Sequence, residues 1–261
     1  ASRFAALVKL YLNDGVKWEI GDRFHSPQLA VLERIAAHGV AGFYEGDVAR
    51  AIIHAVAAES GTMRLADLQT YTASERSVLQ TTFHGRQLIT MPPPSSGGIA
   101  LLQTLQSLEA WENGRQSSLK SLGHNSPEYI HVVTESLKHA FADRAEFLGD
   151  SDFVEVPVAK LLSRQYARDI GKTHSLLEYG RFFAEDDSGT SHFSVVDEMG
   201  NAVACTETIN LAFGSFVVVP EFGILLNNQM DDFAADPGEA NAFGLIQGEA
   251  NAVAPGKRPL S

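Results

Sequence analysis

The residues most able to do chemistry lie in two short runs, residues 190–197 and 201–210. The first run begins with Thr190, directly after Gly189, and the second contains Thr208. In both runs small or polar residues alternate with apolar ones, which is the period of a half-buried β-strand. An aspartate and a glycine between the runs favour a tight turn, so the sequence predicts a β-hairpin.

The short turn also predicts the register of this hairpin. If Asp197 faces Asn201, then Thr190 faces Thr208 at the open end, with Cβ atoms about 4.5–5.5 Å apart. Asn210 is expected on the same face, because it follows Thr208 by two residues. We expect the opposite face, which is apolar, to pack against another layer. That face contains Phe193, Val195, Val203, Cys205 and Ile209.

A threonine at the start of a strand can act as a nucleophile only if a base lies beside its hydroxyl. One solution makes the threonine an N-terminus, so that its own α-amino group is the base. Such a group has a pKa of about 7.7–8.0, whereas an internal amide accepts no proton. The bond between Gly189 and Thr190 would then have to break. On these residues alone, an ordinary edge-strand threonine remains the alternative interpretation.

Composition excludes several classes of protein. The 261 residues are 44% hydrophobic and 20% charged, which is ordinary for a globular protein with a sizeable core. The net charge of −12 argues against a nucleic-acid partner, because phosphates require clustered Lys and Arg. No apolar run approaches the roughly 20 residues of a membrane span. The single cysteine, Cys205, excludes an internal disulfide.

The sequence does not predict a metal or a cofactor. Histidines in the first 90 residues share no ligand spacing. Glu135, His139 and Asp143 follow one another at intervals of four on a predicted helix, a spacing that could hold a metal. We interpret them instead as a polar stripe that contacts solvent or another helix.

Periodicity and capping residues predict the remaining elements. Helices are expected at residues 27–38, 46–58, 99–108 and 127–148, the first and last beginning with Ser-Pro. The apolar face of the last helix is expected to be buried. It contains Ile130, Val133, Leu137, Phe141 and Ala145.

Two β-segments and one linker complete this outline. Residues 81–83 and 86–90 are expected to form a hairpin, and residues 222–230 a further strand. Residues 163–188 are polar and are expected to form an accessible linker before Thr190.

Motifs along nearly the whole chain resemble those of one family in the same order. They are TSHFSVVD (190–197), NNQMDDF (227–233), GEANA (248–252) and PGKRPLS (255–261), preceded by MPPPSSGG (91–98) and AFADR (140–144). They resemble the γ-glutamyltranspeptidase family of the N-terminal-nucleophile hydrolases. The resemblance implies an α+β fold, part of a four-layer αββα sandwich. It also implies that residues 1–189 are the C-terminal part of a large subunit and 190–261 the N-terminal part of a small subunit, together part of one structural domain.

The resemblance implies self-cleavage between Gly189 and Thr190, after which Thr190 forms a γ-glutamyl ester. Thr208 is then expected to orient the nucleophile. The implied donor is glutathione or another γ-glutamyl compound, the acceptor is water, an amino acid or a peptide, and the two subunits form a heterodimer. Substrate-binding positions implied by the family motifs are Asn210, Gln229, Asp232 and Ser261.

Other features leave alternatives open. Three positions depart from the usual family residues, namely Ser191, Phe216 and Phe243. These departures leave the substrate preference open. The family's oxyanion-hole glycines and carboxylate-binding arginine are not among these residues, so we expect this chain to be the middle of a longer protein and inactive alone. The alternatives are an acylase acting on glutaryl-β-lactams or poly-γ-glutamate, and a non-catalytic relative that never matures. The resemblance suggests a periplasmic, secreted or outer-surface location.

Overall fold

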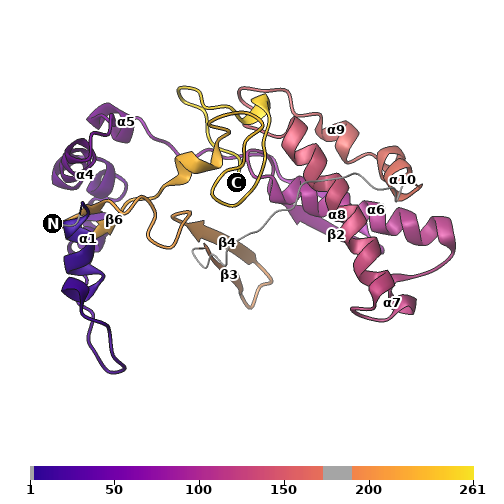
Figure 1. Ribbon diagram of the computed structural model, residues 1–261, viewed down its shortest axis with the longest axis horizontal. Coiled ribbons are helices and arrows are strands. Elements are labelled where there is room, and N and C mark those ends of the chain that lie inside the picture. Colours follow the sequence, from indigo (N-terminus) through magenta and orange to yellow (C-terminus); the bar gives the residue numbers. More distant parts are fainter. Residues whose placement is uncertain (1–2, 173–189) are drawn as a thin grey trace. The chain divides into compact units, whose positions relative to one another are not determined.

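The computed structural model describes residues 3–172 and 190–261, which form two compact units (Figure 1). Unit 1 contains the described residues up to Ser74 and those from Thr190 to Gln229. Unit 2 contains residues 75–172 and 230–261. The expected subunit boundary at Thr190 stays a prediction, and Gly189 lies outside the described residues.

Unit 1 combines short helices with two small sheets. Its elements are α1 (Ala5–Leu10), η1 (Asn13–Gly15), α2 (Leu29–His38), α3 (Ala41–Tyr44), α4 (Gly46–Ala58), α5 (Leu65–Gln69), β3 (Thr190–Val196), β4 (Ala202–Thr208), β5 (Val218–Val219) and β6 (Ile224–Leu225). The predicted helix at 46–58 is confirmed as α4. The helix predicted from residue 27 begins two residues later, as α2, and the Ser26 hydroxyl just before it accepts a hydrogen bond from the Gln28 N–H at 3.2 Å.

The core of unit 1 lies between α2, α4 and the segment around β5. Val48 and Ile52 are four residues apart on α4 and therefore share one face. They pack with Val31 of α2 and with Val219 and Phe222. Residues distant in the sequence thus form one apolar cluster.

The hairpin β3–β4 has the predicted register. Thr190 faces Thr208, and Val196 faces Ala202 next to the turn. The N–H of Asp197 donates to the carbonyl of Asn201 at 3.0 Å. Gly200 has φ = 84°, the left-handed conformation that glycine adopts without steric cost.

The expectation that the apolar face of this hairpin is packed is wrong for the described residues. Phe193, Val195 and Val203 have exposed fractions of 49%, 55% and 59%. β3 pairs with β4 alone in the described ranges, and both strands are exposed along almost their whole length.

The strand predicted at residues 222–230 is also mostly wrong. Two residues of it, Ile224 and Leu225, form β6, which pairs with β5. Residues Gln229–Asp232 instead form a 3₁₀ turn, η2.

Unit 2 contains the long helices. Its elements are β1 (Leu79–Phe83), β2 (Arg86–Thr90), α6 (Gly97–Arg115), α7 (Leu119–Leu122), α8 (Pro127–Phe147), α9 (Val158–Leu161), α10 (Arg164–Lys172) and η3 (Glu249–Asn251). Helix α6 packs against both α8 and α10, and the three lie together in Figure 1. The predicted β1–β2 hairpin and the Ser126 cap of α8 are confirmed, with the Tyr129 N–H donating to the Ser126 hydroxyl at 3.1 Å.

Helix α8 buries part of its polar stripe against other helices and exposes residues of the apolar face that the sequence predicted to be buried. Ile130, Leu137 and Phe141 are exposed, whereas Glu135 and Asp143 are buried. The reason lies in the neighbouring helices, whose side chains are polar where α8 meets them. Gln103 of α6 and Tyr166 of α10 both donate hydrogen bonds to the Asp143 carboxylate.

The predicted linker at 163–188 is in part a helix. Residues Arg164–Lys172 form α10, which buries Ala167 and Ile170. A Cβ atom on Gly171 would lie 3.3 Å from the backbone nitrogen of Trp111, so α10 approaches α6 closely at this glycine. Residues 173–188 lie outside the described ranges.

The described residues mix helices with three two-stranded sheets, as an α+β protein does. Among the helices that the structure describes, none is both long enough and apolar enough to cross a membrane.

Candidate active site

The two threonine hydroxyls meet at the open end of the β3–β4 hairpin. Thr190 is the first residue of β3 and Thr208 the last of β4, so the register places them opposite each other. The Thr190 hydroxyl donates to Thr208 Oγ1 at 3.2 Å. The contact fixes the direction of the Thr190 side chain, and both residues are exposed to an incoming molecule.

Asn210 contributes its backbone to this arrangement. Its N–H donates to Thr208 Oγ1 at 2.9 Å, so that oxygen accepts two hydrogen bonds. β4 ends at Thr208, and Asn210 has φ = 77°, so the expected alternation of faces does not extend to it. The buried side chain of Asn210 instead donates to the carbonyl of Asn228 at 3.3 Å.

Gln229 and Asp232 begin and end η2, on either side of the boundary between the units. The Gln229 N–H donates to the Asn227 side chain at 2.9 Å. Asp232 is buried in unit 2, and its carbonyl accepts from the Asn251 side chain at 2.6 Å. Asn251 also accepts from the Leu260 N–H at 3.0 Å, which ties Asp232 to the segment ending at Ser261.

The backbone of Ser261 is held by the segment before α6. Its carbonyl oxygen accepts from the Ser96 N–H at 2.6 Å and from the Ser96 hydroxyl at 2.9 Å. Its N–H donates to the Pro94 carbonyl at 3.1 Å. The Arg144 guanidinium of α8 donates to the Ser96 hydroxyl at 3.0 Å.

Arg144 is a buried charged group of unit 2 whose pKa is lowered by its surroundings. Burial is the larger effect and lowers the pKa of Arg144. Attraction to the Asp232 carboxylate acts the other way and offsets part of this lowering. A buried cation and a buried carboxylate therefore lie close enough to interact.

The structure thus brings the candidate residues together in two groups. Thr190, Thr208 and Asn210 form one group in unit 1, and Asp232 and Ser261 belong to unit 2. Each group is defined within its own unit. The described residues contain no cluster of three side chains suited to a metal ion.

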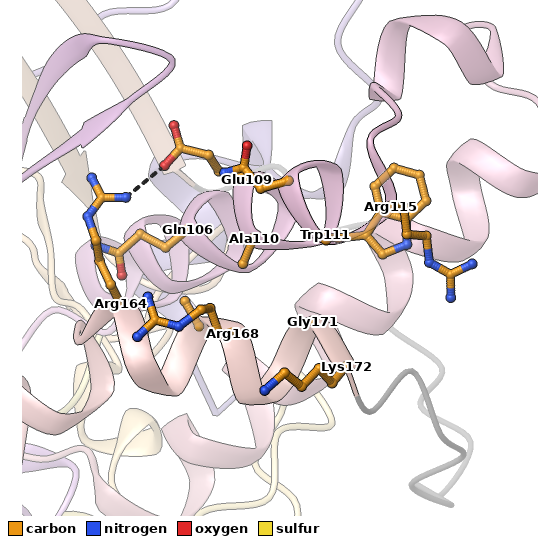
Figure 2. Close-up of a pocket in the computed structure, with 12 residues that line it drawn as sticks. Gln106, Glu109, Ala110, Trp111, Arg115, Arg164, Arg168, Gly171 and Lys172 are labelled. Carbon is orange, nitrogen blue, oxygen red and sulfur yellow. Dashed lines mark hydrogen bonds and ion pairs between the residues drawn. The ribbon is translucent and has the colours of Figure 1, made fainter.

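A groove of unit 2 lies away from these residues. It has a volume of about 580 Å³ and runs between α6 and α10. Figure 2 shows Arg164, Arg168 and Lys172 along α10, with Arg164 paired to Glu109 of α6 at 3.1 Å. None of the candidate site residues lines this groove, so we do not assign the chemistry to it.

Sequence reasoning missed three residues that hold the unit 2 group, namely Ser96, Arg144 and Asn251. All three lie inside motifs that resemble the family, MPPPSSGG, AFADR and GEANA. A motif shows that a residue is present but does not show which other residues it contacts. Here the contacts join segments that are up to 165 residues apart.

Comparisons with known proteins agree with these observations. The family model described as Gamma-glutamyltranspeptidase matches residues 2–261. The chain is 41% identical to the glutathione hydrolase proenzyme of Escherichia coli (strain K12), over 97% of this chain and 44% of that protein. It is 36% identical to the acylase ACY 1 proenzyme of Pseudomonas sp. (strain SE83), over 98% of this chain and 44% of that protein.

A solved structure supports the fold assignment. The γ-glutamyltranspeptidase of Helicobacter pylori is 32% identical, with a TM-score of 0.57 over 67% of this chain and 50% of that one. The predicted α+β fold of the N-terminal-nucleophile hydrolases is thereby confirmed. The chain spans about 44% of the length of the relatives named above. It belongs to the γ-glutamyltranspeptidase family.

Proposed function

We propose that the protein containing this chain transfers or hydrolyses γ-glutamyl groups through an ester on Thr190. The observation that carries the proposal is the contact of 3.2 Å between the hydroxyls of Thr190 and Thr208 at the first residue of β3. The name of the Escherichia coli relative, a glutathione hydrolase proenzyme, supports both the reaction and a precursor form.

Maturation precedes catalysis in this proposal. The Thr190 oxygen attacks the carbonyl carbon of Gly189, and the bond from that carbon to the Thr190 nitrogen breaks. The nitrogen takes up the proton of the hydroxyl, leaving an ester between the two residues. Water then hydrolyses the ester, which releases Gly189 as a carboxylate and Thr190 with a free α-amino group.

The matured Thr190 then acts on the substrate. Its α-amino group accepts the proton of its own hydroxyl as the oxygen attacks the γ-carbonyl of glutathione or another γ-glutamyl donor. The leaving amine takes this proton and departs, and a γ-glutamyl ester remains on Thr190. Water or the amino group of an amino acid or peptide then attacks the ester. Thr208 holds the nucleophile through the hydrogen bond between the two hydroxyls, which limits its rotation.

Recognition of the donor is assigned to the remaining residues. Asp232 pairs with the α-ammonium group, since a carboxylate gives charge-assisted hydrogen bonds. Ser261 binds the α-carboxylate, and Asn210 and Gln229 contribute amide groups. After cleavage, the parts before and after Thr190 would form the two subunits of a heterodimer.

An acylase is the second candidate, favoured by the 36% identity to the acylase ACY 1 proenzyme. Its donor would be a glutaryl-β-lactam or poly-γ-glutamate. A glutaryl amide lacks the α-ammonium group that Asp232 would bind. Activity on glutaryl but not on γ-glutamyl amides would therefore support the acylase.

Expression of the full-length protein tests the proposal. Gel electrophoresis and N-terminal sequencing are expected to give two fragments, one beginning at Thr190, together with turnover of a γ-glutamyl anilide. A Thr190→Ala variant is expected to remain one uncleaved chain without activity. Ser191→Ala, which alters the next residue of the same exposed strand, serves as the matched control and should mature normally.

The opposing results are equally clear. An uncleaved wild-type protein would support the non-catalytic relative. Cleavage of Thr190→Ala between the same two residues would contradict the self-cleavage mechanism, because that variant has no hydroxyl to attack Gly189.

A further inference from the structure

Arg144 is a buried charge that the proposed reaction does not yet use. Its exposed fraction is 6%, although it lies on α8, a helix whose other face is open to solvent. Removing a guanidinium from water is costly unless hydrogen-bonding or charged groups replace the water. At Arg144 the water is replaced by the Ser96 hydroxyl and the Asp232 carboxylate, which lie at the candidate donor-binding residues.

The first of these groups is the Ser96 hydroxyl. A guanidinium can only donate, so Ser96 Oγ accepts from Arg144 Nε at 3.0 Å. The hydrogen of the same hydroxyl is then directed to the carbonyl oxygen of Ser261, 2.9 Å away. Arg144 thereby orients a hydroxyl that holds the backbone of Ser261 in place.

The second group is the Asp232 carboxylate, which has an exposed fraction of 8% and attracts the Arg144 charge. The backbone of Asp232 is already fixed by Asn251. The opposite charge of Arg144 helps to offset the cost of burying this carboxylate.

We infer that Arg144 is a positioning residue for the charged end of the donor. Its guanidinium holds Ser261 in place through Ser96, and its charge favours the nearby Asp232 carboxylate, in the arrangement that binds the α-carboxylate and α-ammonium groups. The inference rests on the proposed function, because it takes Asp232 and Ser261 as the ligands of that end. Arg144 itself is covered and does not touch the donor.

This role predicts a particular kinetic change. We expect the contacts with the charged end of the donor to be made equally in the ground state and the transition state. The loss of such contacts raises KM and leaves kcat nearly unchanged. In the full-length protein we expect Arg144→Met to raise KM for a γ-glutamyl anilide about 10-fold or more, with kcat within about 3-fold. Arg144→Lys keeps the charge but loses the planar fork, so its KM should lie in between.

Competitive inhibition separates positioning from a general loss of structure. Glutamate carries both charged groups of the donor end, whereas glutarate lacks the α-ammonium group. Arg144→Met is expected to raise the inhibition constant of glutamate more than that of glutarate, because the contact with Asp232 is made by glutamate alone. A loosened fold would weaken both inhibitors alike.

Two further variants make the test independent of whether Arg144→Met matures. Ser96→Ala removes only the hydroxyl and keeps the backbone N–H bound to Ser261, so we expect a smaller rise in KM. That rise should not add to the effect of Arg144→Met, since the two side chains act through one contact. Arg168→Met, which removes an exposed arginine from α10 (Figure 2), is the matched control and should leave KM unchanged.

The outcomes are decisive in both directions. A raised KM with the stated inhibitor difference supports the inference. Unchanged KM in Arg144→Met and Ser96→Ala, or a fall in kcat alone, would overturn it while leaving the proposed function intact. If Arg144→Met is not cleaved, Ser96→Ala decides. A wild-type protein that does not use γ-glutamyl anilides would instead refute the proposed function itself.

Discussion

At the scale of single residues, the hydroxyl of Thr208 holds the candidate nucleophile. Its oxygen accepts one hydrogen bond from the Thr190 hydroxyl and a second from the Asn210 N–H. The second bond comes from the backbone, whose position is fixed where the strand ends. Thr208 is therefore a fixed acceptor, and the direction of the Thr190 side chain follows from it.

Removing this acceptor should slow the reaction without abolishing binding. We expect Thr208→Ala to lower kcat by about 100-fold, because a misplaced nucleophile loses the benefit of orientation. Thr208→Ser keeps Oγ and should stay within about 3-fold of wild type. Steady-state kinetics on matured protein gives both values. Equal rates for the alanine and serine variants would show that the hydroxyl has no part in orienting Thr190.

At the scale of elements, sequence patterns predicted the features that depend on contacts between neighbouring residues in the chain. The hairpin register followed from the turn, since the alternation of β3 and β4 extends directly from it. The helix α4 and the N-terminal cap of α8 followed from sequence patterns for the same reason. The buried face of α8 did not, because the polar network around Asp143 depends on α6 and α10. Nor did α10 itself, whose polar sequence buries only Ala167 and Ile170.

The candidate site divides in the same way. Opposed threonines at the hairpin end could be deduced from spacing, whereas Asp232 and Ser261 came only from the family resemblance. The contacts that hold them, through Ser96, Arg144 and Asn251, join segments far apart in the chain. A periodic pattern within one segment does not predict contacts with a segment far away in the chain.

The turn of the β3–β4 hairpin gives a prediction about pH. Hydrogen bonds from the Asn201 side chain and from the backbone N–H groups of Asn201, Met199 and Gly200 lower the pKa of Asp197. A carboxylate with a lowered folded pKa stabilises the hairpin above its unfolded pKa, and this contribution is lost as the pH falls through the folded value. The turn should therefore loosen only in acid, below about pH 4.

Titration of ¹³C-labelled aspartate carboxyls in the full-length protein measures this effect, with Asp197→Asn identifying the resonance. We expect Asn201→Ala to move the pKa of Asp197 upward, toward that of a free aspartate, because it removes the side-chain donor at 2.7 Å. Glu198→Ala, a change in the same exposed turn, should leave the pKa unchanged. A pKa for Asp197 equal in wild type and Asn201→Ala would refute this account of the turn.

At the scale of the whole molecule, each unit depends on contacts between segments that are distant in the chain. Unit 1 builds its core from helices α2 and α4 and from residues beyond 200. In unit 2 the fully buried Asp150 links segments from the beginning, the middle and the end of the unit. The carboxylate of Asp150 accepts from Arg76 at 3.1 Å and from the N–H of Arg258 at 2.9 Å.

This contact also bears on the candidate site, because Arg258 lies three residues before Ser261. Asp150→Asn removes the charge that pairs with Arg76 and places an amide where two donors converge. Breaking a buried pair in this way costs about 3 kcal/mol or more, which corresponds to about 100-fold more frequent opening. We therefore expect faster hydrogen exchange at the Arg258 amide and along residues 255–261, measured by mass spectrometry on the full-length protein.

Asp152→Asn is the control. It alters an exposed carboxylate that binds Arg76, the same arginine that pairs with Asp150, and it should leave the hydrogen exchange of residues 255–261 nearly unchanged. If the two variants exchanged alike, the segment that carries Ser261 would have to be held by its hydrogen bonds to Pro94 and Ser96 rather than by Asp150.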